Sequence, residues 1–112
     1  MKLNIPIRAL SINKAFQGRR FKSKEHRQYE KDIHNLIRYS KNALCGDIEA
    51  HYTFHIKNSK KTDADNLVKC LQDILVSMNY IKDDRYISRY IIEKKYSKDE
   101  HIEVEYSCIK TV

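Results

Sequence analysis

Residues 47–78, DIEAHYTFHIKNSKKTDADNLVKCLQDILVSM, combine two hydrophobic periods joined by a short charged segment. Over 47–57 apolar and polar residues alternate, which is the period of a strand with one buried face. The residues placed on that face are Ile48, Ala50, Tyr52, Phe54 and Ile56. From about 64 to 78 apolar residues recur at helical spacing, and the predicted buried stripe is Leu67, Leu71, Ile74, Leu75 and Met78. The stretch therefore predicts a strand followed by an amphipathic helix.

The flanking segments complete an α+β pattern. Residues 2–7 are a predicted strand, which Pro6 confines to a sheet edge or ends early, and 8–22 are a predicted loop. Ser23 is the predicted N-cap of a helix over about 24–41. Residues 86–95 and 101–109 are predicted strands, and the polar turn between them predicts a hairpin. The order β-α-β-α-β-β predicts a mixed β-sheet with two helices packed on it.

Length and charge narrow the class of protein. We expect 112 residues to form a single domain, 1–112. There is no apolar run of roughly 20 residues and no signal-peptide pattern, so a cytoplasmic protein without membrane contact is expected. The 22 Lys and Arg against 15 Asp and Glu give a net charge of +7, which favours a nucleic-acid partner. No Gly-rich phosphate loop is present, so no nucleotide cofactor is expected.

The cysteines and histidines give no metal motif. The three cysteines are far apart and form no CxxC pair, so we interpret them as reduced, at least partly buried thiols. His51 and His55 share one face of the predicted strand, but four residues along a strand span about 13 Å, which is too far for one ion.

Aspartates gather around the start of the second predicted helix. Asp65 and Lys69 are four residues apart and share the polar face of the helix, where Gln72 falls between them, and Asp63 lies just before the helix. Asp83 and Asp84 follow the helix after a short connection. Carboxylates are the hard oxygen ligands that Mg²⁺ prefers, and such an ion can bind a scissile phosphate and activate water. On a basic chain these aspartates predict a metal site for cutting nucleic acid.

The same spacing is compatible with ordinary structural roles for these aspartates. Asp63 or Asp65 can cap the helix, where hydrogen bonding and the helix dipole both favour a carboxylate. Asp65 and Lys69 can form an ordinary ion pair on the helix surface. Asp83 and Asp84 can belong to a solvated turn.

The motifs together resemble the RusA family of Holliday junction resolvases. Residues 63–69, DADNLVK, are similar to the family signature D-x-D-N-x-x-K, which is followed by a helix aspartate, here Asp73, and by an Asp-Asp pair, here at 83–84. Residues 11–13, SIN, are similar to its S-x-N loop, and residues 23–29 to its serine-led helix with an internal tyrosine. The resemblance covers roughly 5–106, and the family's proline-rich segment is replaced by IRAL at 7–10.

The resemblance implies a RusA-like fold and a homodimeric endodeoxyribonuclease. The family resolves four-way DNA junctions by paired symmetric nicks, with Mg²⁺ or Mn²⁺ as cofactor. It implies that Asp63, Asp65 and Asp84 are catalytic metal ligands, with Asp83 as an alternate ligand, and that Lys69 is catalytic or contacts phosphate. Two alternatives remain: an inactive branched-DNA-binding module, and a nuclease that also cuts flaps or other branched DNA.

Basic residues on either side of the acidic motif are the predicted DNA contacts. They are Arg19, Arg20, Lys22, Lys24, Lys57, Lys60 and Lys61. For any single lysine a solvated surface position is the competing interpretation. We interpret Lys94, Lys95 and Lys98 as solubilising residues.

Overall fold

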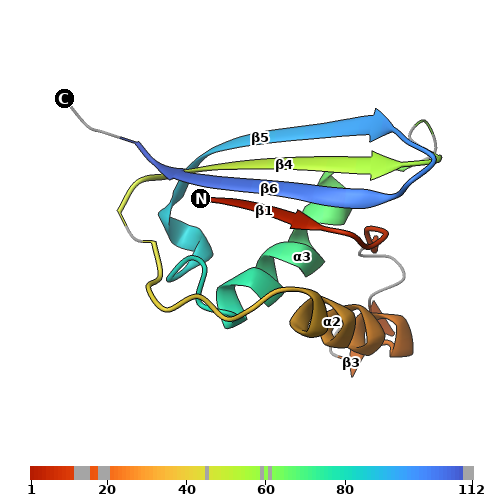
Figure 1. Ribbon diagram of the computed structural model, residues 1–112, viewed down its shortest axis with the longest axis horizontal. Coiled ribbons are helices and arrows are strands. Elements are labelled where there is room, and N and C mark those ends of the chain that lie inside the picture. The colour runs from red at the N-terminus through yellow and green to blue at the C-terminus, as the bar shows by residue number, and fades with distance from the viewer. Residues whose placement is uncertain (12–15, 18–20, 45, 59, 61, 110–112) are drawn as a thin grey trace.

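The computed structural model describes residues 1–11, 16–17, 21–44, 46–58, 60 and 62–109. The strands are β1 (Lys2–Ile5), β2 (Phe16–Gln17), β3 (Phe21–Lys22), β4 (Ile48–Ile56), β5 (Ile87–Tyr96) and β6 (His101–Cys108). The helices are α2 (Lys24–Leu36), α3 (Asp65–Ser77) and the short 3₁₀ helix η1 (Asp84–Tyr86). Both α-helices lie on the same side of the sheet (Figure 1). The predicted mixed sheet with two packed helices is confirmed.

The main sheet has the strand order β1-β6-β4-β5. β4 pairs in parallel with β5 and antiparallel with β6, and β1 pairs antiparallel with β6. β4 is central, and its inward residues, Ile48, Ala50, Tyr52, Phe54 and Ile56, are all buried. β1 is an edge strand that ends just before Pro6, as predicted.

The predicted hairpin between the last two strands is wrong. β4 lies between β5 and β6, so these two strands are not neighbours. Helix α3 returns the chain to the beginning of β4, and β5 therefore pairs with β4 in parallel, as in a β-α-β unit. Neighbouring strands are about 4.8 Å apart, so the four residues between β5 and β6 are long enough to pass the end of one strand.

Helix α2 begins as predicted and ends earlier. The Ser23 side chain accepts a hydrogen bond from the backbone N–H of His26 at 3.1 Å, which confirms the N-cap. The helix ends at Leu36 rather than near 41, and Ile37 is extended. The following segment instead runs beside the residues after α3, where Leu44 forms a parallel bridge with Ile81. The predicted loop at 8–22 contains the short antiparallel pair β2–β3.

Helix α3 matches its predicted range closely. All five residues of its predicted stripe are buried, and Gln72, expected on the polar side, is buried as well at 4% exposure. Cys70 is buried but Cys108 is exposed, so the expectation for the cysteines is wrong for Cys108, and Cys45 lies outside the described residues. No helix among the described residues is long and apolar enough to cross a membrane.

Candidate active site

Asp63 and Asp65, on either side of the start of α3, make no side-chain capping bond to that helix. Ala64 occupies the N-cap position and makes no side-chain capping bond. The first turn is closed by backbone bonds, from the Asn66 N–H to the Asp63 carbonyl at 3.2 Å and from the Leu67 N–H to the Ala64 carbonyl at 3.1 Å. Asp63 and Asp65 are both exposed. Among the described residues neither carboxylate is used as a cap, so the capping interpretation is wrong, although the helix dipole still favours a negative charge there.

Lys69 pairs with carboxylates other than Asp65. Its Nζ donates a hydrogen bond to Asp73 Oδ1 at 3.1 Å and lies 3.8 Å from Asp84 Oδ2. The hydrogen bond to Asp73 and the Asp84 charge raise the Lys69 pKa, so the ammonium stays charged. The simple Asp65–Lys69 ion pair is therefore not the arrangement found. Asp65 lies about 6 Å earlier along the helix axis, one turn before Lys69.

The turn after α3 presents Asp84 toward this helix. The Asp83 side chain accepts a hydrogen bond from the Arg85 N–H at 3.0 Å and caps η1. This backbone bond is the main reason that the Asp83 pKa is lowered. Asp84, the first residue of η1, is only partly exposed and faces Lys69. Asp83 therefore shapes the turn, and Asp84 is more than a solvated turn residue.

A buried polar network holds α3 against the sheet beside this cluster. The Tyr52 hydroxyl donates to Gln72 Oε1 at 2.8 Å, and the Tyr106 hydroxyl lies 2.8 Å from the Tyr52 hydroxyl oxygen. Because the Tyr52 proton goes to Gln72, Tyr106 is the donor to Tyr52. Burial raises the pKa of both tyrosines, so both stay neutral. Gln72 lies between Lys69 and Asp73 in the sequence, so the network fixes the helix turn that carries them. Helical spacing alone did not predict this network because it placed Gln72 on the polar side.

Asp63 lies in a cleft of about 720 Å³ between α2 and α3. Ser11 and Tyr29 line the same cleft, so residues of three separate family-like motifs meet there. Ile12 and Asn13 of the S-x-N segment are outside the described residues. Neither Asp65 nor Asp84 belongs to the lining of this cleft. Of the three predicted ligands, the lining of this cleft therefore includes Asp63 alone.

The loop before α3 is held at several points. Lys94 Nζ on β5 donates to the Thr62 carbonyl at 2.6 Å, next to Asp63. The Lys57 N–H donates to Glu100 Oε2 at 3.3 Å. Lys94 is thus more than the solubilising residue expected, because it fixes the loop that carries Asp63. Lys94 and Thr62 are 32 residues apart, so no local sequence pattern could have predicted this hydrogen bond.

Three of the predicted DNA contacts can be placed. Lys24, Lys57 and Lys60 are exposed, with Lys24 in the first turn of α2 and the other two in the loop before α3. Arg19, Arg20 and Lys61 lie outside the described residues, and the side chain of Lys22 is not among those described.

The donor set fits Mg²⁺ in kind. Asp63, Asp65 and Asp84 offer carboxylate oxygens, and Mg²⁺ needs only one or two carboxylates together with waters and substrate phosphate. Within the described part of the chain, the three aspartates do not form a group with ligand atoms all within 4.8 Å; a different cluster, His55, His101 and Glu103, does. The convergence of the aspartates on one ion therefore stays a prediction.

Comparison with known proteins agrees with the motif. No curated protein matches the chain. The family model described as Endodeoxyribonuclease RusA matches residues 8–106, which include both α-helices, the two Asp-rich segments, β4, β5 and most of β6, but not β1. The chain belongs to the endodeoxyribonuclease RusA family.

Proposed function

We propose that the protein is a Holliday junction resolvase, a Mg²⁺-dependent endonuclease that makes paired symmetric nicks in four-way DNA junctions. The main support for this function is the position of Lys69. It lies one helical turn after Asp65 and 3.8 Å from Asp84, so it joins the two Asp-rich segments around one surface of α3. Its own charge and those carboxylates are the groups that phosphodiester hydrolysis requires.

Each residue has a distinct proposed role. Asp63, Asp65 and Asp84 would hold the ion, and Asp83 would position Asp84. When bound, Mg²⁺ or Mn²⁺ supplies an activated water and neutralises charge on the phosphate. The Lys69 ammonium stabilises the extra negative charge of the phosphate in the transition state. Asp73 accepts a hydrogen bond from Lys69 and so orients that ammonium.

The basic residues account for DNA affinity. Lys24, Lys57 and Lys60, together with Arg19, Arg20, Lys22 and Lys61, would bind backbone phosphates and offset repulsion by the aspartates. Removing any one phosphate-binding side chain should lower the slope of log affinity against log salt by about 0.9. A homodimer with a two-fold axis would place two active sites on equivalent strands of a junction. Such an enzyme serves DNA recombination and repair, and its substrate implies a cytoplasmic location.

Two other functions compete with this one. The exposed aspartates disfavour an inactive branched-DNA-binding module. Their negative charges repel DNA phosphates and so weaken DNA binding unless a bound cation offsets them. A nuclease acting also on flaps would use the same residues and differ only in substrate preference.

Cleavage assays with labelled four-way junction, flap and linear duplex test the proposal. We expect symmetric nicks in the junction with Mg²⁺ or Mn²⁺, and none in EDTA. Asp65→Asn should abolish cutting and leave junction binding intact or tighter. Asp99→Asn is the matched control, because it removes the same charge from the exposed turn before β6 and should cut normally. Undiminished nicking by Asp65→Asn would contradict the assignment, and equal cutting of flaps would favour the broader nuclease.

A further inference from the structure

The sheet face away from the helices brings two histidines and a glutamate together. His55 on β4 pairs directly with His101 on β6, and Thr53 pairs with Glu103. These residues alternate with buried core residues, so they point away from α2 and α3. Along β4 alone, His51 is too far from His55 to share an ion with it. The strand register instead joins His55 to His101 across two strands.

The three side chains have the spacing of metal ligands. One donor atom from each of His55, His101 and Glu103 lies within 4.8 Å of the other two. The distance from His55 Nε2 to Glu103 Oε2 is 3.3 Å. A tetrahedral zinc ion about 2.0–2.2 Å from a nitrogen and an oxygen places those two atoms about 3.3–3.5 Å apart. The pair therefore already has the separation that one ion imposes.

Both histidines have a ring nitrogen available for an ion. His55 Nε2 is buried and makes no well-formed hydrogen bond, despite its closeness to Glu103. His101 Nδ1 lies 2.7 Å from the Asp99 carbonyl oxygen, and a carbonyl only accepts, so Nδ1 carries the proton. The lone pair of His101 is then on Nε2. A backbone carbonyl that sets the tautomer in this way is typical of metal-binding histidines.

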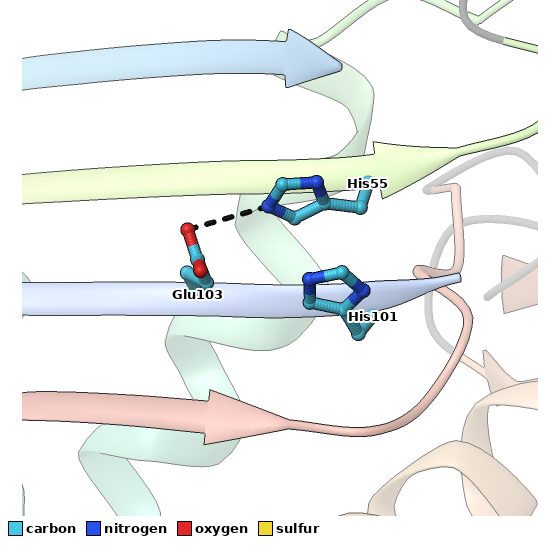
Figure 2. Close-up of side chains that lie close together, drawn as sticks. All are labelled: His55, His101 and Glu103. Atoms are coloured by element: carbon cyan, nitrogen blue, oxygen red, sulfur yellow. Dashed lines mark ion pairs between the residues drawn. The ribbon is translucent and has the colours of Figure 1, made fainter. Parts of the chain in front are cut away.

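The two imidazole rings lie face to face on the outer side of the sheet. The two imidazoles are stacked, with centroids 3.9 Å apart and planes 11° apart. Figure 2 shows that each ring turns one nitrogen toward the Glu103 carboxylate. The in-plane lone pairs of two parallel rings point side by side rather than at one point, so one ring has to rotate for both nitrogens to bind the same ion.

The surrounding charges are mixed. Lys95 on β5 is opposite His55 in the sheet, and its Nζ lies 3.9 Å from Glu93 Oε2. Lys95 is the charge that opposes a bound cation.

We propose that His55, His101 and Glu103 bind Zn²⁺ and so join β4 to β6 at the end of the sheet. Two imidazoles and one carboxylate are a set of three zinc ligands, which leaves a fourth position for water or an added ligand. This site uses none of the aspartates of the proposed active site, and it stands whether or not the protein cuts junctions.

Zinc titration of tag-free protein against a chromophoric chelator tests the site. We expect one Zn²⁺ bound by the wild type, with affinity lowered more than about 100-fold in His55→Asn, His101→Asn and Glu103→Gln, because even residues that only support ligands change affinity 10–100-fold. His51→Asn is the matched control, since it removes a histidine from the same strand face but outside the cluster. Asp65→Asn should keep this zinc, which separates it from an ion held by the aspartates.

Two further measurements complete the test. Saturating Zn²⁺ should raise the Tm of the wild type and of His51→Asn by roughly 10 °C, and should not raise that of His55→Asn. Co²⁺ in place of Zn²⁺ should show the visible absorption of a tetrahedral site, lost in the same variants. Thermal melting of the metal-free variants shows that they fold. Unchanged zinc affinity in folded His55→Asn and His101→Asn would overturn the proposal, as would loss of the zinc in Asp65→Asn.

Discussion

Replacing Lys69 with methionine is the sharpest test of the proposed active site. Lys69→Met keeps a side chain of similar length and removes the ammonium that contacts Asp73 at 3.1 Å and Asp84 at 3.8 Å. The two carboxylates then lose their shared cation, and a substrate phosphate loses a fixed positive charge. The side chain of Lys69 is 52% exposed, so both ion pairs are screened by solvent.

The expected effects on stability and on catalysis differ in size. An exposed ion pair contributes about 0.2–1 kcal/mol, so losing two pairs should cost less than about 2 kcal/mol. Removing one group that stabilises transition-state charge typically lowers the rate 10²–10³-fold, which is about 2.7–4 kcal/mol. The variant should therefore remain folded and cut far more slowly.

Single-turnover cleavage of a labelled junction with enzyme in excess measures the chemical step. Junction binding in EDTA and thermal melting are measured on the same samples. Lys69→Arg should recover part of the rate because it keeps the charge, and Lys41→Met controls for loss of one exposed lysine near the other end of α3. Cleavage by Lys69→Met within about 3-fold of the wild type, or a loss fully accounted for by weaker binding, would refute the reasoning.

Three further predictions concern the residues that support the site. Lys94→Met removes the hydrogen bond to the Thr62 carbonyl. It should lower the cleavage rate roughly 5-fold, which corresponds to about 1 kcal/mol, and leave junction affinity in EDTA unchanged. Unaltered cleavage would contradict the role of Lys94 in fixing the loop that carries Asp63. Tyr52→Phe leaves both Gln72 and Tyr106 without their shared partner and should lower the free energy of unfolding by about 2–4 kcal/mol. Tyr106→Phe should lower it by about 1 kcal/mol. Equal urea midpoints for the two variants would contradict the network. Burial raises the pKa of both tyrosines, so above about pH 10 they ionise in the unfolded chain before they do in the folded protein. The free energy of unfolding should therefore fall there by up to about 1.4 kcal/mol per pH unit for each tyrosine. This loss should be smaller in Tyr52→Phe, and an unchanged pH dependence in that variant would contradict the reasoning.

The local pattern of the chain was enough to predict most elements. Strict alternation over 47–57 and helical spacing over 64–78 depend only on neighbouring residues, and both elements form within a residue or so of the expected bounds. Ser23 was predictable as a cap for the same reason, because its partner, the His26 N–H, is three residues away. The DxDNxxK run and the later Asp pair were enough to predict the family, which the family match over 8–106 confirms.

Contacts between distant residues needed the tertiary structure. The hairpin prediction failed because the pairing of β5 with β4 depends on the return path of α3, which no local pattern encodes. Lys69 pairs with Asp84 across the turn that follows α3, whereas helical spacing alone pointed to Asp65.

The acidic motif and the histidine cluster show the same division. The sequence predicted Asp63, Asp65, Asp84 and Lys69 as the residues of the proposed chemistry, through the resemblance of two separate segments, 63–69 and 83–84, to the family signature. The three-dimensional structure was needed to show that neither Asp63 nor Asp65 caps α3 and that Asp63 lines a cleft while Asp84 faces Lys69. It was also needed to show that His55 meets His101 and Glu103. His55 meets His101 because of strand register, which is set by the packing of the whole sheet rather than by adjacent residues. Asp84 meets Lys69 because the turn after α3 folds back onto that helix, which likewise depends on packing between distant residues.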